Sequence, residues 1–236
     1  MTSTAPQGLV LRDGPALPPL RHFKLAAFDM DSTLIGIECI DEIAALAGKG
    51  AEVAAITEAA MRGEIPDFRA SLARRLALLA GTPASVLERV LAERLRFNPG
   101  ARELCAAMKA AGLKLVLVSG GFTYFTRYVA AELGMDFVRS NALEIADGAL
   151  TGRVVMQDWG DVCDGEQKRL MLLDCCARIG CTPAQAIAVG DGSNDLPMMG
   201  VAGLSVAYHA KPRVREQAMV SIDAGGLDRL LEVVRP

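Results

Sequence analysis

Three short apolar runs stand out in the pattern of hydrophobic and polar positions along the chain. Each run is continuous and ends directly before a polar residue: 25–28 before Asp29, 115–118 before Ser119, and 186–190 before Asp191. Uninterrupted apolar runs of this length are typical of strands that are buried on both faces of a sheet. In a parallel sheet, the residues that follow such strands meet at one edge, where ligands bind.

Helical patterns lie between these runs, at residues 101–111, 124–133 and 165–179. The alternation of strands and helices predicts an α/β fold with a Rossmann-like parallel sheet. Residues 141–155 carry Asp147-Gly148 between two alternating stretches, a pattern that predicts a small β-hairpin.

A long insertion separates the first two predicted strands. More than eighty residues lie between them, and residues 38–94 have the pattern of several helices without a strand. We therefore predict a helical cap at 37–97, inserted after the first strand and packed over the strand ends. The catalytic core would then comprise 21–36 and 98–236, with 35–37 and 97–100 as the two connections.

Residues 1–20 hold four prolines among small residues and lack the basic start and apolar centre of a secretory signal. We predict a flexible N-terminal arm for this segment. The longest apolar runs are far shorter than the roughly 20 residues of a membrane span, so no membrane partner is expected.

Composition narrows the chemistry. A net charge of -3 and 22% charged residues give no basic footprint for nucleic acid. The six cysteines form no C-x-x-C pair and are expected to be reduced, which favours the cytoplasm. The two histidines, His22 and His209, are too few for a histidine metal site or a Ser-His-Asp triad. Catalysis would therefore depend on carboxylate, Lys, Ser and Arg side chains.

Asp29 and Asp31 lie two residues apart, which in an extended segment turns both carboxylates to the same side. One carboxylate can attack phosphorus and form an aspartyl-phosphate, while the other protonates the leaving alkoxide and later activates water. Taken alone, a helix-capping role for Asp31 or Ser32 is the favoured alternative.

The stretch 191–195 adds hard oxygen ligands after the third predicted strand. Attack by a carboxylate on a dianionic phosphate requires positive charge, and Mg²⁺ is the cation that such ligands suit. A calcium loop is rejected because Leu196 and Ala202 occupy its Gly and Glu positions. A dinucleotide fingerprint beginning at Gly190 is also disfavoured, because Asp195 replaces its third glycine.

Ser119-Gly120-Gly121, at the expected end of its strand, offers a hydroxyl and backbone amides suited to phosphate oxygens, although a simple glycine turn would look the same. Lys168 shares a helix face with Leu172 and Cys175, so it could point inward or remain a solvated surface lysine.

Arg75 lies on one stripe of a cap helix with Phe68, Leu72 and Leu79, whereas Arg74 is turned away. An arginine on an apolar face requires an anionic partner, either a substrate carboxylate or a cap acid such as Glu38 or Glu64. Glu38, at the entry to the cap, could face a substrate ammonium or favour the helix N-terminus by its charge.

Four motifs together carry a family resemblance. DMDST (29–33), SGG (119–121), Lys168 and GDGSND (190–195) follow the order of the four motifs of the haloacid dehalogenase superfamily. Within it, stretches 37–44, 68–79, 118–125 and 207–212 resemble those of bacterial phosphoserine phosphatases. Many such relatives carry a further N-terminal domain, for which residues 1–20 are too short.

The resemblance implies a role for each matching residue. Asp29 would be the phosphorylated nucleophile and Asp31 the general acid and base. Mg²⁺ would be held by the Asp29 and Asp191 side chains and the Asp31 backbone carbonyl. The other implied roles are phosphate binding by Ser119, Gly120, Lys168 and Asn194, support of the lysine and metal by Asp195, recognition of the substrate ammonium by Glu38, and recognition of its carboxylate by Arg75.

The implied reaction is Mg²⁺-dependent hydrolysis of O-phospho-L-serine to L-serine and phosphate, the last step of serine biosynthesis, by a cytoplasmic monomer or homodimer. Alternative substrates are phosphohomoserine, phosphothreonine or another small phosphomonoester. A phospho-receiver signalling domain also uses an acceptor Asp, a Lys and Mg²⁺, but Asp31 and the predicted cap argue against it.

Overall fold

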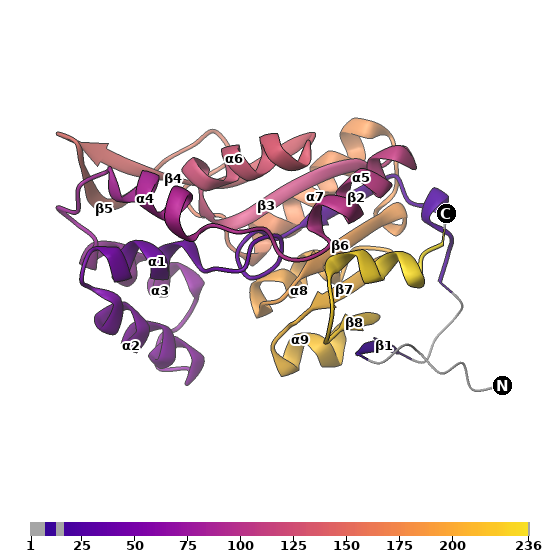
Figure 1. Cartoon of the computed structure of the whole chain (residues 1–236), viewed down its shortest axis with the longest axis horizontal. Coiled ribbons are helices and arrows are strands. Elements are labelled where there is room, and N and C mark those ends of the chain that lie inside the picture. The colour runs from indigo at the N-terminus through magenta and orange to yellow at the C-terminus, as the bar shows by residue number, and fades with distance from the viewer. Residues whose placement is uncertain (1–7, 13–16, 236) are drawn as a thin grey trace.

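The computed structural model describes residues 8–12 and 17–235. Over these residues one eight-stranded sheet runs through the molecule in the order β1-β8-β7-β6-β2-β3-β4-β5 (Figure 1). Its strands are β1 (Leu9–Leu11), β2 (Leu25–Phe28), β3 (Lys114–Phe122), β4 (Phe137–Ala146), β5 (Ala149–Val155), β6 (Ala186–Gly190), β7 (Leu204–Tyr208) and β8 (Val220–Ile222).

The six central strands, from β8 to β4, pair in parallel, and only the edge strands β1 and β5 are antiparallel. Every residue of β2, β6 and β7 is buried. Burial on both faces explains why these strands are continuous apolar runs rather than alternating ones. The predicted parallel α/β core is confirmed.

Helices cover both faces of the sheet. Alternate residues of β2 enter different cores, since Ala26 and Phe28 belong to one apolar cluster and Leu25 and Ala27 to the other. The first cluster is closed by α5 (Ala101–Ala110) and α6 (Thr123–Leu133), and the second by α7 (Gly165–Ile179), α8 (Leu196–Met199) and α9 (Pro212–Gln217). Short turns of helix complete the described chain: η1 (Leu20–His22), η3 (Pro183–Gln185), η4 (Ser193–Asp195) and η5 (Leu227–Glu232).

The segment between β2 and β3 is helical. It contains α1 (Cys39–Leu46), α2 (Gly50–Met61), α3 (Phe68–Leu78), α4 (Val86–Arg89) and the π-helical turn η2 (Val90–Arg94). These helices lie together at one end of the molecule, beside β5 (Figure 1). The insertion follows the second strand along the chain rather than the first, because β1 precedes the first predicted strand.

The two connections to this helical segment lie side by side. Ile35 and Phe97 form an antiparallel bridge. The Gly36 amide donates to the Arg96 carbonyl at 3.0 Å, and the Asn98 amide donates to the Leu34 carbonyl at 2.9 Å. Because entry and exit are joined by backbone hydrogen bonds, the helices between them are attached to the sheet as one unit.

The hairpin of β4 and β5 forms as predicted, around Asp147 and Gly148. Both residues have positive φ, 49° and 74°, the combination that a type I′ turn requires. The hairpin also contacts the helical segment, because the Gly81 amide donates to the Leu150 carbonyl and the Ala84 amide to the Gly148 carbonyl, each at 2.8 Å. The segment after α3 is thus bound to the edge of the sheet.

The prediction of a flexible arm over residues 1–20 is wrong for Leu9–Leu11, which form β1 and pair antiparallel with β8. Leu9 and Leu20 are buried at 2% and 1% exposure, so apolar contacts hold this segment against the core. Residues 1–7 and 13–16 lie outside the described residues. Across the described chain, no helix is long and apolar enough to cross a membrane.

Candidate active site

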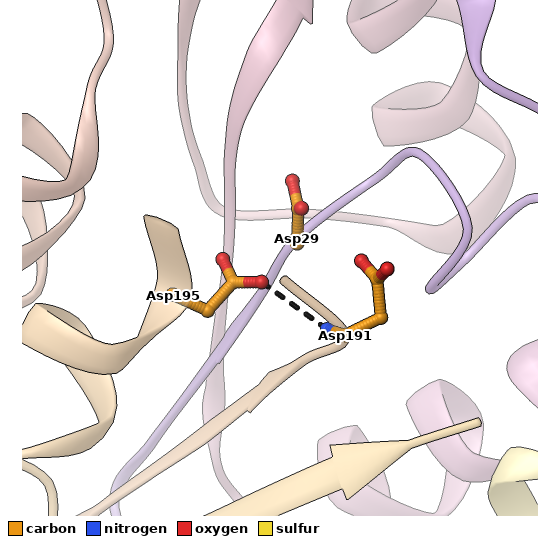
Figure 2. A group of neighbouring side chains, drawn as sticks. All are labelled: Asp29, Asp191 and Asp195. Carbon is orange, nitrogen blue, oxygen red and sulfur yellow. Dashed lines mark hydrogen bonds between the residues drawn. The ribbon is translucent and has the colours of Figure 1, made fainter. Parts of the chain in front are cut away.

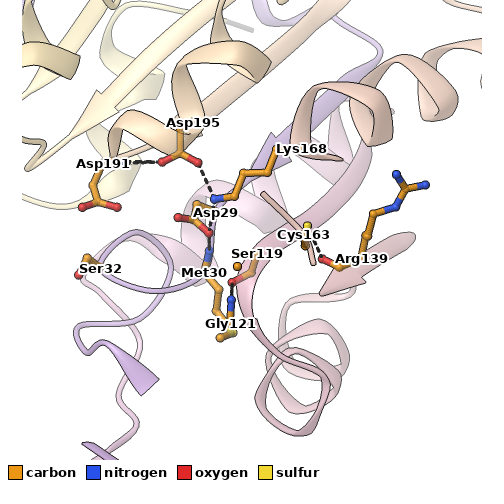
Figure 3. Close-up of polar contacts among 12 residues, drawn as sticks. Asp29, Met30, Ser32, Ser119, Gly121, Arg139, Cys163, Lys168, Asp191 and Asp195 are labelled. Carbon is orange, nitrogen blue, oxygen red and sulfur yellow. Dashed lines mark hydrogen bonds and ion pairs between the residues drawn. The ribbon is translucent and has the colours of Figure 1, made fainter. Parts of the chain in front are cut away.

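The predicted polar residues meet at the carboxyl edge of the parallel sheet (Figure 3). Asp29 follows β2, Asp191 follows β6 and Ser119 lies in β3. Because β2 pairs with both β3 and β6, its neighbours bring their polar residues to either side of Asp29. Asp29, Ser119 and Asp191 are all buried.

Lys168 points into this site, so of the two readings of its helix face the inward one is correct. Its side chain is fully buried, with Nζ 2.9 Å from Asp29 Oδ1 and 2.6 Å from Asp195 Oδ1. Burial disfavours the charged ammonium, but the carboxylates of Asp195 and Asp29 raise the pKa of Lys168 well above its usual value. The lysine therefore remains a cation beside Asp29.

Asp29, Asp191 and Asp195 form an acid cluster whose carboxylate oxygens approach within 4.8 Å of one another (Figure 2). Burial raises the pKa of Asp29 well above its usual value and, with repulsion from Asp195, raises the pKa of Asp191 to about 7. When ionised, three buried carboxylates beside one lysine leave an excess of negative charge, which is why burial opposes the ionisation of Asp29 and Asp191. Hard oxygen donors with such an excess fit a divalent cation such as Mg²⁺.

Asp195 also organises the loop around the cluster. Its Oδ2 accepts hydrogen bonds from the backbone amides of Asp191 and Gly192, at 3.1 and 3.0 Å. One carboxylate therefore holds both the loop and Lys168. Asn194, in η4, is half-buried with its side chain against Gly192.

Asp31 lies beyond Asp29 in a tight loop. Its Oδ1 accepts a hydrogen bond from the Cys39 amide at 3.2 Å, so part of the helix-capping alternative holds. Its other oxygen faces Gly121, where an added Cβ would lie 2.6 Å from Asp31 Oδ2. Burial, followed by repulsion from Glu38, raises the pKa of Asp31 to about 7. A carboxyl with this pKa can donate or accept a proton near neutrality.

The loop after Asp31 is held by polar contacts. Ser32 has a positive φ of 57°, and its hydroxyl donates to Glu38 Oε1 at 2.8 Å. Asn98 Nδ2 donates to the Thr33 carbonyl at 2.8 Å and to the Ile35 carbonyl at 3.2 Å. These contacts bind the entry and exit of the helical segment to the loop that carries both acids.

The glycine turn at 119–121 differs from the prediction, because β3 continues to Phe122 instead of ending at Ser119. Its register against β4 shifts between Val118 and Phe122, which re-aims the backbone. The Ser119 hydroxyl accepts a hydrogen bond from the Gly121 amide at 2.8 Å. Asn141 Nδ2 donates to the Gly120 carbonyl at 2.6 Å, so a β4 side chain holds this turn.

Arg75 is half-buried on α3, whereas Arg74 is exposed, as the stripe predicts. Burial lowers the pKa of Arg75, and the carboxylates of Asp41, Glu38 and Asp31 act in the opposite sense. The predicted cap partners bind elsewhere, since Glu64 pairs with Arg62 at 2.6 Å and Glu38 accepts from Ser32. Arg75 therefore lies close enough to Asp41, Glu38 and Asp31 to feel their charge, and none of them forms an ion pair with it among the described contacts.

The sequence reasoning missed three residues around the site. Asp41 Oδ1 is buried without a hydrogen-bond partner among the described residues. Asp41 lies in the first turn of α1, three positions after the N-cap residue Glu38, where an acid is ordinary and carries no distinguishing signal. Lys211, whose amide donates to the Asp191 carbonyl at 3.1 Å, lies within the stretch 207–212 that carries the family resemblance, whereas Asn141 carries no local signal.

Comparison with known proteins identifies the family. A sequence model of the haloacid dehalogenase-like hydrolases matches residues 26–200, from β2 to the end of α8. The chain belongs to this family. The family resemblance of the four motifs and the predicted α/β class are thereby confirmed, and the acids of this hydrolase lie on the strand ends described above.

Two relatives named phosphoserine phosphatase are similar to this hydrolase over nearly their whole length. A phosphoserine phosphatase from Polaromonas sp. is 64% identical, with 97% of each chain covered. Another from Albidiferax ferrireducens is 62% identical over 100% of this chain and 99% of the relative. A solved structure described as a phospho-aspartyl intermediate analogue of phosphoserine phosphatase superposes with a TM-score of 0.83 at 37% identity, covering 90% of this chain and 99% of that one.

Proposed function

We propose that this hydrolase converts O-phospho-L-serine and water to L-serine and phosphate, through an aspartyl-phosphate on Asp29. The observation that carries the proposal is the Lys168–Asp29 contact of 2.9 Å inside the acid cluster. This contact places the Asp29 carboxylate next to the Lys168 ammonium, at the edge of the sheet where substrates bind in α/β folds. Relatives named phosphoserine phosphatase at 62–64% identity support the choice of substrate.

In the first step, an Asp29 oxygen forms a bond to phosphorus while the bond from phosphorus to the serine oxygen breaks. Asp31 supplies a proton to the departing alkoxide. In the second step, Asp31 takes a proton from water, the water oxygen bonds to phosphorus, and the Asp29 carboxylate leaves. The raised pKa of Asp31, about 7, suits both directions of this proton transfer.

Positive charge and amides hold the phosphate during these steps. Lys168 interacts with the phosphate oxygens, and Ser119, Gly120 and Asn194 donate hydrogen bonds to them. Asp29, Asp191 and the Asp31 backbone carbonyl would hold Mg²⁺, with Asp195 in support. When bound, Mg²⁺ neutralises charge on the acids and on the phosphate, which lowers the repulsion between nucleophile and substrate.

The amino-acid part of the substrate is recognised from the helical segment. Arg75 binds the carboxylate with a planar pair of donors, and Glu38 binds the ammonium. We accordingly treat 37–97 as a cap and 21–36 with 98–236 as the catalytic core. The enzyme would act in the cytoplasm, as the last step of serine biosynthesis, as a monomer or homodimer. The free state of all six cysteines supports a reducing compartment.

The proposal is tested by measuring steady-state phosphate release from a panel of phosphorylated amino acids and sugars, with Mg²⁺ and with EDTA. We expect phosphoserine to have the highest kcat/KM, EDTA to abolish turnover, and Asp29→Asn to be inactive while remaining folded. A preference for phosphohomoserine or phosphothreonine would correct the substrate. Labelling of Asp29 without steady release would instead favour a phospho-receiver.

A further inference from the structure

Arg69 joins cap helix α3 to the loop that precedes α7. Its Nε lies 2.6 Å from Asp164 Oδ2, its Nη1 lies 2.8 Å from Asp161 Oδ1, and its Nη2 donates to the Val162 carbonyl at 3.2 Å. All three nitrogens of the guanidinium thus bind one short segment more than ninety residues away. Such a fork of planar donors is specific to arginine. We call these contacts the Arg69 fork.

On the cap side, the fork begins next to residues that cover the phosphate site. Arg69 directly follows Phe68, whose ring lies against Gly120: a Cβ on that glycine would be 2.7 Å from Phe68 Cζ. Arg75 lies further along the same helix. The position of the N-terminal end of α3 therefore determines the position of the Phe68 and Arg75 side chains relative to Gly120 and the acid cluster.

On the core side, the fork ends on the start of the helix that carries Lys168. The Asp164 side chain caps α7 by accepting from the Gln167 amide at 3.0 Å, and its carbonyl accepts from the Lys168 amide at 3.0 Å. One guanidinium thus connects the helix that presents Arg75 with the helix that presents Lys168.

The two ends of α3 are attached in different ways. Beyond its C-terminus, backbone hydrogen bonds join Gly81, Thr82 and Ala84 to the β4–β5 hairpin, each at 2.8 Å. At its N-terminus, the Arg69 fork is partly open to solvent, with 44% of Arg69 and 45% of Asp161 exposed. Exposed ion pairs are weak and are screened by salt. The N-terminal end is thus the one that can separate while the other remains attached.

The geometry points to Arg69 as a positioning residue whose contacts with Asp161 and Asp164 hold the N-terminal end of α3 on the phosphate site and thereby align Phe68 and Arg75 with the substrate. The identity of that substrate rests on the proposed function. The fork itself is a property of the chain that can be tested with or without substrate.

Loss of the fork reduces the fraction of molecules in which α3 is seated, and the apparent affinity falls with that fraction. Arg69→Ala should therefore raise the KM for phosphoserine about threefold to tenfold and leave kcat within about twofold. A small aryl phosphate has no carboxylate for Arg75, so its KM should change much less. Added salt should raise the wild-type KM for phosphoserine and bring it toward the Arg69→Ala value.

The variants to compare are Arg69→Ala, Arg69→Lys, Asp161→Asn and the double variant Arg69→Ala/Asp161→Asn. Arg74→Ala, in the same helix and exposed, serves as the matched control. KM and kcat are measured for phosphoserine and for an aryl phosphate at about 0.05 and 0.5 M salt. Arg69→Lys should recover part of the affinity for phosphoserine. The KM of the double variant should be no higher than that of Arg69→Ala, because Asp161→Asn removes a contact that Arg69→Ala has already removed.

The inference is overturned if Arg69→Ala leaves the KM for phosphoserine unchanged, raises it equally for both substrates, or matches Arg74→Ala. Should the wild-type protein fail to hydrolyse phosphoserine, the proposed function fails while the fork stays testable by amide hydrogen exchange. Faster exchange over residues 68–78 in Arg69→Ala than in Arg74→Ala supports the fork, and equal exchange overturns it.

Discussion

The Lys168 ammonium lies 2.9 Å from Asp29 Oδ1 in a site where the lysine is fully buried. A second carboxylate, that of Asp195 in η4, lies with its Oδ1 2.6 Å from the same ammonium. Because Lys168 is fixed from two sides, it neither swings away nor loses its charge when a phosphate approaches. In the proposed reaction, the attacking carboxylate and the phosphate-binding cation would thus be arranged before substrate arrives, which reduces the reorganisation needed in the transition state.

Replacement of Lys168 by Met should affect catalysis and stability together. We expect kcat to fall by at least about 100-fold, because a charged donor aimed at the phosphate is lost. We also expect the free energy of unfolding to fall by about 3 kcal/mol, because buried carboxylates lose their cation. Phosphate-release kinetics and urea denaturation measure the two effects.

The double variant Lys168→Met/Asp195→Asn separates these contributions. Removing a carboxylate as well as the lysine relieves the unpaired charge, so part of the lost stability should return while activity stays low. Recovery of activity in the double variant would show that Lys168 acts only as a structural counter-ion.

Arg75→Ala should impair recognition of the amino-acid substrate rather than the chemistry at phosphorus. We expect kcat/KM for phosphoserine to fall by about 100-fold and that for an aryl phosphate to change by less than about threefold, because only phosphoserine offers a carboxylate to the guanidinium. Arg75→Lys should be intermediate, since an ammonium cannot bind both carboxylate oxygens in one plane. An equal loss on both substrates would contradict the role assigned to Arg75.

Much of the candidate site could be predicted because its signals are local. The apolar runs before Asp29 and Asp191 correspond to β2 and β6, and the predicted helix at 165–179 has the same bounds as α7. Because neighbouring strands of a parallel sheet end at the same edge, the residues that follow these strands lie close together. The proximity of Asp29, Ser119 and Asp191 follows from this arrangement without knowledge of any side-chain contact, whereas the role predicted for each residue rests on the family resemblance.

Other features depend on pairings between distant segments, which periodicity does not encode. β1 is a three-residue strand that exists through its pairing with β8, and a proline-containing stretch gives no local sign of it. β3 continues through Ser119 to Phe122, where Asn141 of the neighbouring strand donates to the Gly120 carbonyl. The Arg69 fork joins residues that are far apart in sequence, and Asp41 looks like an ordinary acid of a first helical turn.

Gly120 and Gly121 are adjacent but have different neighbours, so alanine substitution at the two positions should have different kinetic effects. A Cβ on Gly121 would lie 2.6 Å from Asp31 Oδ2 and 3.0 Å from Ser119 Oγ. We expect Gly121→Ala to lower kcat by about 100-fold on every phosphomonoester, since a displaced acid loses its geometry. A Cβ on Gly120 meets the end of the Phe68 ring, which can move. Gly120→Ala should mainly raise the KM for phosphoserine.

Gly50→Ala provides the control for these glycine variants. Gly50 begins α2 and has negative φ, and a Cβ there meets no atom closer than 3.5 Å. Its kinetics should match those of the wild-type protein. If Gly121→Ala also kept full activity, the close approach of Asp31 to that glycine would have no catalytic importance.

Asp136 should make stability depend on pH at the start of β3. Its Oδ2 accepts from the Leu115 amide at 2.9 Å, and its Oδ1 accepts from Lys114 Nζ at 2.8 Å. Burial acts to raise the pKa of this carboxyl, but the Leu115 amide together with Lys114 and Lys109 lowers it below its usual 3.8. The unfolded chain therefore binds a proton more readily than the folded one.

It follows that the stabilisation from Asp136 is complete above the unfolded-state pKa and is lost as pH falls through the lower folded-state pKa. Asp136→Asn should lower the free energy of unfolding at neutral pH, and the difference from wild type should shrink as pH falls from about 5 toward 3. Urea denaturation in EDTA across this range measures the difference without interference from bound metal. Asp158→Asn, at an exposed position, makes the same change in net charge. If the two variants were indistinguishable at every pH, the contacts of Asp136 with Leu115 and Lys114 would contribute nothing to stability.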